Sequence, residues 1–147
     1  MAINNPNHSR YLDRAVREAG HKLVHHSNTD TWIADDETAV QTIIDTYDPV
    51  PYAKEAKIAL LRLETLRLAN LIYDPDGDEE EVFTSINWLK IVLDINTSYT
   101  SSGSPSARWQ DLGQTISAQQ SAVTAINALT SVATVEAYDV TSDPGWP

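Results

Sequence analysis

An acidic tract holds the densest group of possible metal ligands in the sequence. It runs Asp74-Pro75-Asp76-Gly77-Asp78-Glu79-Glu80-Glu81, and closely spaced carboxylates are the ligands that Ca²⁺ prefers. An EF-hand loop starting at Asp74 would need a glycine at position 79 and a glutamate at position 85, where the chain has Glu79 and Ser85. We therefore expect a turn between two helices, whose acids stabilise the N-terminus of the second helix.

Histidines form the second group that could hold a metal ion. His21, His25 and His26 lie close together, with His8 upstream. A zinc site needs three or four ligands, and no third ligand stands at a familiar spacing. If His25 and His26 lie on a strand, their side chains point to opposite faces. The interpretation that we favour is a set of surface or hairpin histidines.

Motifs for covalent catalysis and for cofactor binding are missing from the sequence. There is no Gly-x-Ser-x-Gly elbow, no phosphate-binding glycine loop and no dinucleotide fingerprint. The chain has no cysteine, which excludes disulfides, thiolate chemistry and zinc ribbons. Paired carboxylates such as Asp35 and Asp36 are explained by helix capping. We predict a protein that is not an enzyme, with no catalytic, cofactor-binding or metal-binding residues.

Composition limits the partners. The 147 residues include 21 acidic and 10 basic side chains, which gives a formal net charge of −11. That charge repels phosphate backbones and anionic membranes, so we expect neither nucleic acid nor a membrane as partner. No apolar run approaches the roughly 20 residues that cross a bilayer, and the N-terminus lacks a secretory signal. We expect a soluble protein that stays in the cell that makes it.

The first third of the chain predicts a small α-β-β-α head over residues 1–48. Residues 8–19 form an amphipathic pattern, with Ser9 as a possible N-cap and Gly20 as a possible C-terminal stop. Two short β-prone runs, 22–25 and 31–34, flank a polar turn and predict a hairpin. A second helix is expected from Asp35 until Pro49 ends it.

The remainder, residues 52–147, predicts a helical region after a short stiff joint at Pro49-Val50-Pro51. Helices are expected at about 52–73, 79–95 and 107–130, followed by a short helix within 132–138 and an extended tail. The fold class that we predict is mainly α (α+β), with the small head preceding a helical bundle.

The central helix, residues 52–73, carries apolar residues on more than one face. One stripe holds Ile58, Leu61, Leu68 and Ile72, and a second holds Ala56, Leu60, Leu63 and Leu66. A helix that packs on a single neighbour needs only one such stripe. The sequence therefore predicts burial on two sides, which one neighbouring helix cannot supply.

Four tryptophans are candidates for packing or docking. Trp32, Trp88 and Trp109 lie in apolar patterns and are expected in the core. Trp146 stands between Gly145 and Pro147 at the end of the sequence. Two interpretations remain open for it: an anchor that docks on a partner, or a tail that folds back on its own domain.

Parts of the first half resemble short proteins encoded among the tail genes of tailed bacteriophages. The resemblance lies in Leu12-Asp13-Arg14-Ala15-Val16-Arg17-Glu18-Ala19-Gly20, Trp32-Ile33-Ala34-Asp35-Asp36 and Val40-Gln41-Thr42-Ile43-Ile44-Asp45-Thr46-Tyr47-Asp48-Pro49. Those proteins pair a head of this kind with a helix rich in Lys, Glu and Arg, here Ala53 to Leu71. The resemblance implies a tail, baseplate or fibre component, or a factor that helps fibres to assemble.

Two functional hypotheses follow. The first is a structural adaptor of the virion, made in the host cytoplasm, which associates with itself and with other virion or tail proteins. The second is a chaperone for tail-fibre assembly that does not stay in the virion. A small enzyme with an unfamiliar site is a third and weaker hypothesis.

Overall fold

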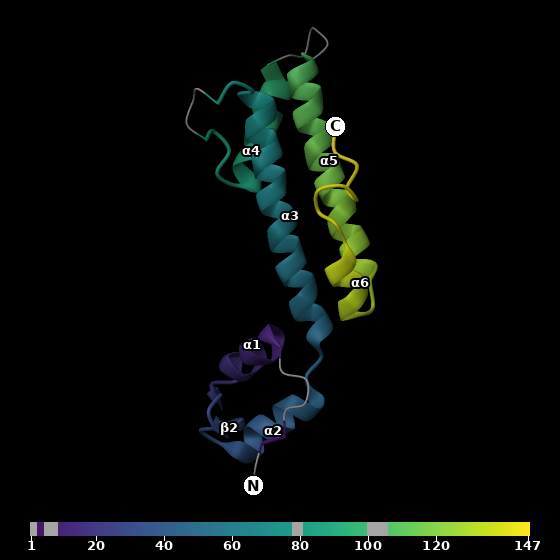
Figure 1. Cartoon of the computed structure of the whole chain (residues 1–147). Coiled ribbons are helices and arrows are strands. Elements are labelled where there is room, and N and C mark those ends of the chain that lie inside the picture. Colours follow the sequence, from purple (N-terminus) through teal and green to yellow (C-terminus); the bar gives the residue numbers. More distant parts are fainter. Residues whose placement is uncertain (1–2, 5–8, 78–80, 100–105) are drawn as a thin grey trace. The chain divides into compact units, whose positions relative to one another are not determined.

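The protein consists mainly of helices, with one two-stranded antiparallel sheet near its N-terminus (Figure 1). This confirms the predicted fold class, mainly α (α+β). The computed structural model describes residues 3–4, 9–77, 81–99 and 106–147. The chain divides into two compact units, Met1–Ala53 and Lys54–Pro147, which we call the head and the helical unit.

The head begins with α1 (Arg10–Glu18), which is one or two residues shorter than predicted at each end. Ser9 is its N-cap, and its hydroxyl accepts a hydrogen bond from the backbone N–H of Leu12. Gly20 follows with a φ of 84°, a left-handed conformation that favours glycine. The expected cap and stop are both confirmed.

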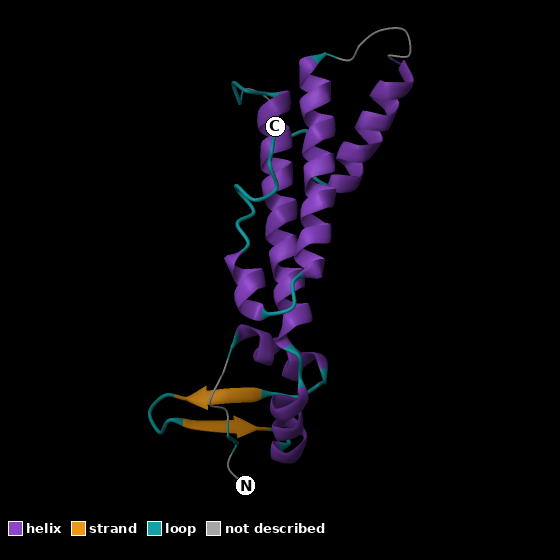
Figure 2. Cartoon of the chain, turned by 90° about the vertical axis from the view of Figure 1, so that its right-hand side faces the viewer, coloured by secondary structure: helices purple, strands orange, loops and turns teal. Residues whose placement is uncertain are grey.

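A β-hairpin and a second helix complete the head. Strands β1 (Leu23–His26) and β2 (Thr31–Ala34) pair antiparallel, in a register that sets Leu23 opposite Ala34 (Figure 2). Helix α2 (Glu37–Thr46) follows, and the Asp36 carboxylate caps it by accepting from the N–H of Ala39. The buried core of the head includes the cluster of Ile3, Leu12, Val16 and Val40.

Helix α3 (Pro49–Tyr73) starts earlier than predicted. The expected joint Pro49-Val50-Pro51 is wrong, because these residues form the first turn of the helix. The first N–H groups of a helix have no intrahelical acceptor, so proline, which lacks an N–H, is tolerated there. The carboxylate of Asp48 accepts a hydrogen bond from the N–H of Val50, 3.0 Å away.

Helix α4 (Ile86–Tyr99) starts later than the predicted residue 79 and ends four residues beyond the predicted end. Residues 79 and 80 lie outside the described part of the chain, and residues 81–85 are not helical. The reason is local: Ser85 caps the helix through its hydroxyl, which accepts from the N–H of Trp88. Before it, the side-chain amide of Asn70 holds Phe83 by accepting from its N–H and donating to its carbonyl, at 2.8 and 3.0 Å.

Two more helices follow, α5 (Ala107–Ala128) and the short α6 (Val132–Ala137). Helices α3 and α5 run antiparallel, because contacts join opposite ends of the two (Figure 2). The Arg108 guanidinium lies over the Tyr73 ring, and the Lys54 ammonium donates to the Asn127 carbonyl. The buried core of this unit includes a cluster of residues from α3, α4, α5 and the segment before α4: Ala69, Phe83, Leu89, Leu112 and Ile116. No helix among the described residues is both long enough and apolar enough to cross a bilayer.

Candidate functional site

The acidic tract forms a turn after α3 in the part that the structure describes. The N–H of Gly77 donates to the carbonyl of Asp74, and Gly77 has a φ of 71°. Residues 78–80 of the tract lie outside the described ranges. The expected role of the acids at the next N-terminus is wrong for Glu81, because α4 begins five residues after it and is capped by Ser85.

Two histidines of the hairpin region, His21 and His25, contact different carboxylates. His21 faces Asp35, with 3.3 Å between Nδ1 and the carboxylate, whereas His25 lies 2.9 Å from Asp30 and stacks on Trp32. The Asp35 carboxylate also accepts a hydrogen bond from the N–H of Lys22 at 3.0 Å, and this contact lowers the pKa of Asp35. Within the described ranges, no three His, Asp or Glu side chains are grouped to hold a metal ion. His8 lies outside those ranges.

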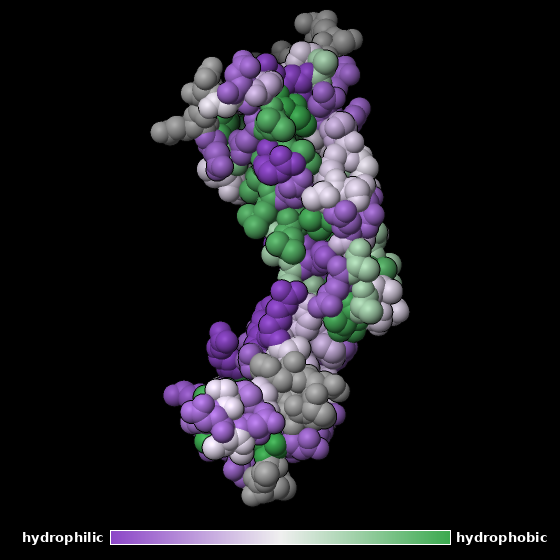
Figure 3. Space-filling view, viewed as in Figure 1, coloured by the Kyte–Doolittle hydropathy of each residue, from purple (hydrophilic) through white to green (hydrophobic). Residues whose placement is uncertain are grey.

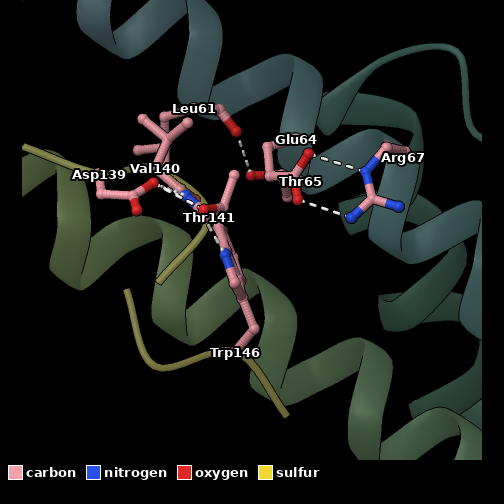
Figure 4. Close-up of polar contacts among 8 residues, drawn as sticks. All are labelled: Leu61, Glu64, Thr65, Arg67, Asp139, Val140, Thr141 and Trp146. Carbon is pink, nitrogen blue, oxygen red and sulfur yellow. Dashed lines mark hydrogen bonds and ion pairs between the residues drawn. The ribbon is translucent and has the colours of Figure 1, made fainter. Parts of the chain in front are cut away.

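Trp146 contacts the segment just before it, which is the arrangement expected of a tail that folds back on its own domain. Its indole N–H donates to the carbonyl of Val140 at 3.0 Å, and its side chain is half-buried (Figure 4). The expected extended tail carries a turn at this point. Asp139 organises the turn by accepting from the N–H and hydroxyl of Thr141 and from the hydroxyl of Ser142. These hydrogen bonds lower the pKa of Asp139.

Trp88 contradicts the prediction that it belongs to the core. Trp32 and Trp109 are half-buried and pack against the cores of their own units. Trp88, by contrast, is 44% exposed and shares one face of α4 with Ile91 and Ile95, which are 48% and 49% exposed. The sequence contained the signal, because steps of three and four residues join these three side chains on a face distinct from that of the buried Leu89.

The two predicted stripes of α3 differ in their burial. In the first stripe, Leu61 is fully buried, and Ile58, Leu68 and Ile72 are half-buried. In the second stripe, Leu60 is 51% exposed and Leu63 is 65% exposed, whereas Ala56 and Leu66 are half-buried and Leu66 packs against the core. Leu71, outside both stripes, is 50% exposed. Figure 3 shows apolar surface gathered over α3 and interrupted by polar groups. The chain therefore covers one side of α3 and leaves the other open.

We use the name open face for the side of α3 that carries Leu60, Leu63, Glu64, Arg67 and Leu71. An ion pair lies at its middle: the Arg67 guanidinium donates two hydrogen bonds to the Glu64 carboxylate, at 2.7 and 2.8 Å (Figure 4). This pairing lowers the pKa of Glu64 and raises that of Arg67. Glu64 lies at the covered edge of the face, whereas Arg67 is largely exposed.

A surface hollow of about 320 Å³ lies at the C-terminal end of the open face. Arg67 and Leu71 form one wall, and residues after α3 form the other. The lining residues are Arg67, Asn70, Leu71, Tyr73, Asp74, Gly77, Glu81 and Val82. Sequence reasoning missed this hollow, because it depends on Asn70 holding the Val82-Phe83 segment against α3.

The described residues therefore offer apolar contact surface as their main functional feature. Large exposed apolar patches on a folded unit mark contacts with other molecules more often than scattered single residues do. Comparison with known proteins adds nothing to this: no family model, no curated protein and no solved structure matches the chain.

Proposed function

We propose that this protein is a non-enzymatic structural adaptor of a tailed-bacteriophage virion, which acts through protein–protein contacts in the tail, baseplate or fibre. The observation that carries the adaptor role is the pair of half-exposed apolar faces on the helical unit, Leu60-Leu63-Leu71 on α3 and Trp88-Ile91-Ile95 on α4. Covering exposed apolar side chains with a partner removes them from water and lowers the free energy, which favours association. The phage assignment rests on the resemblance of the first half.

The proposed partners are other virion or tail proteins and further copies of this chain. The charge of −11 supports proteins over nucleic acid or anionic membranes. The proposed place of the protein is the virion, after synthesis in the host cytoplasm.

Mass spectrometry of purified particles tests the proposal. In phage particles whose genome encodes this chain, the protein should be present in a fixed ratio to other tail proteins. If it is abundant in infected-cell lysate and missing from particles, the alternative holds: a tail-fibre assembly chaperone that leaves before the virion is complete.

A pair of matched double variants tests the contact surface. Leu60→Ser with Leu63→Ser removes apolar surface from α3, and Val24→Ser with Ile33→Ser removes equally exposed surface from the hairpin of the head. We expect the α3 variant to be lost from particles and the hairpin variant to be retained. Loss of neither would contradict the role of α3, provided that circular dichroism shows both to be folded.

A further inference from the structure

We propose that the open face of α3 pairs with the same face of a second copy of the chain, with the two helices antiparallel. This inference rests on the proposed function in one respect. The proposed adaptor role requires partners for the exposed apolar faces of α3 and α4, and the inference names the partner of the face on α3. It follows from the order and spacing of the residues on that face.

The open face is self-complementary. Leu60, Glu64, Arg67 and Leu71 follow one another at steps of four, three and four residues, which keeps them on one side of a helix. The spacing reads the same in both directions, and the charges are opposite about the centre. In an antiparallel pair centred there, Leu60 therefore lies level with Leu71 of the second copy, and Glu64 lies level with its Arg67.

A parallel pair would lack this match. It would set Glu64 beside Glu64 and Arg67 beside Arg67, and like charges placed opposite each other are unfavourable. The antiparallel arrangement instead sets the Arg67 guanidinium of each copy beside the Glu64 carboxylate of the other. Arg67 makes this contact from the exposed side of the face, because 59% of its side chain is accessible, whereas Glu64 has 14% of its side chain accessible at the covered edge.

The hollow beside Leu71 provides space for a side chain of the second copy. Leu60 of that copy lies level with Leu71, and Leu71 and Arg67 form one wall of the hollow. A leucine that enters it would be buried on both sides, as knobs are in the holes of a helix pair. One helix face of about four turns is small compared with the roughly 1,200–2,000 Å² of a stable interface. We therefore expect a dimer that dissociates on dilution.

Sedimentation velocity over a range of concentrations tests the pairing in the isolated full-length protein. The expected result is a monomer that becomes a dimer as concentration rises. Leu60→Ser with Leu71→Ser should abolish the dimer, whereas Ile91→Ser with Ile95→Ser, an equally exposed pair on α4, should leave it intact. A monomer at all concentrations, or a dimer lost only in the α4 variant, would overturn the inference.

Charge reversal provides a second test on the same instrument. Glu64→Arg alone sets four arginines together and should weaken dimerisation at least tenfold. Adding Arg67→Glu restores the alternating order and should restore the dimer. If the single variant dimerises as well as the native chain, the ion pairs do not face each other across the interface and the inference fails.

Crosslinking determines the relative direction of the two helices. The native chain has no cysteine, so a thiol-specific reagent reacts only at the introduced cysteines. A short bismaleimide should join Leu60→Cys chains to Leu71→Cys chains in a mixture and should not join Leu60→Cys chains to each other. In the antiparallel register two residues at position 60 lie 11 residues apart along the axis, about 16 Å at 1.5 Å per residue. Efficient crosslinking of Leu60→Cys with itself would indicate parallel pairing and overturn the inference.

The outcomes separate this inference from the proposed function. A chain that is monomeric alone and present in virions would keep the adaptor role and lose the self-pairing. A chain that dimerises through α3 and is missing from virions would keep the self-pairing and lose the adaptor role.

Discussion

Helices α3 and α5 are similar in length and lie antiparallel, yet they differ in what they leave exposed. Helix α5 buries one stripe, and its outer positions, such as Gln114, Ser117, Gln120 and Thr124, are polar and exposed. Helix α3 also buries one stripe but leaves Leu60, Leu63 and Leu71 half-exposed. Burial of one stripe covers most of the apolar surface of α5 but leaves apolar surface of α3 exposed. The residue types on the outer side of a helix therefore determine whether a further partner can bury apolar surface there.

The two buried stripes also differ in composition. Helix α5 places Thr115 and Gln119 among its buried residues, and α3 places Thr65 there. Each threonine donates to a carbonyl four residues earlier in its own helix, at 2.7–2.8 Å, so neither needs a partner on another helix. Gln119 has a longer side chain and makes no side-chain hydrogen bond within the described part of the chain.

The largest expected effect comes from making the same substitution on the buried side and on the exposed side of α3. Leu61 is fully buried and its neighbour Leu60 is half-exposed, so the pair offers the same chemical change in two environments. Leu61→Ala should lower the free energy of unfolding by about 2–5 kcal/mol, because it leaves a cavity. Leu60→Ala should change it by less than about 1 kcal/mol. Urea denaturation of dilute protein measures both, and equal losses would contradict the described burial.

The next effect concerns the polar contact that α3 makes with the segment before α4. Asn70→Ala removes both hydrogen bonds to Phe83 and should lower the free energy of unfolding by about 1–3 kcal/mol. Asn87→Ala on the exposed side of α4 is the matched control and should change stability by no more than about 0.5 kcal/mol. Thermal unfolding followed by circular dichroism compares them.

A substitution in α5 should increase stability. Gln119→Met keeps an unbranched side chain in place and removes a buried amide that has no hydrogen-bond partner among the described residues. It should therefore raise the free energy of unfolding by about 1–2 kcal/mol. Gln120→Met at the adjacent exposed position should have almost no effect. If Gln119→Met destabilises the protein, the amide is satisfied in the native state, for instance by water.

The smallest effect is the pH dependence of the Glu64–Arg67 pair. Arg67 lowers the pKa of Glu64 below its ordinary value of 4.5 in the folded chain. A lowered folded pKa stabilises the protein above the unfolded value, and this contribution is lost as the pH falls through the folded value. Glu64→Gln should therefore cost about 0.2–0.5 kcal/mol at pH 7, the usual size for such pairs on one helix. The difference in urea midpoint between variant and native protein should be largest at pH 7 and should shrink as the pH is lowered below the ordinary pKa of 4.5.

Local sequence signals predicted much of the fold. The caps at Ser9 and Asp36, the glycine at position 20 and the uninterrupted run from Tyr52 to Tyr73 each act through contacts within a few residues. The start of α4 was wrong, because Glu79–Glu81 suit a helix N-terminus as well as Ser85 does. The choice between them depends on Asn70, which is distant in sequence and holds Phe83 in a non-helical conformation.

The sequence by itself determined that α3 has apolar residues on two sides, since helical periodicity assigns each residue to a face without reference to any neighbour. Only the tertiary structure decided which side the chain covers with its own residues. Leu61 and Leu60 are adjacent and chemically identical, and their different burial depends on where α4, α5 and the C-terminal tail pack. The same holds for Trp88, which the apolar pattern placed in the core and the structure leaves 44% exposed.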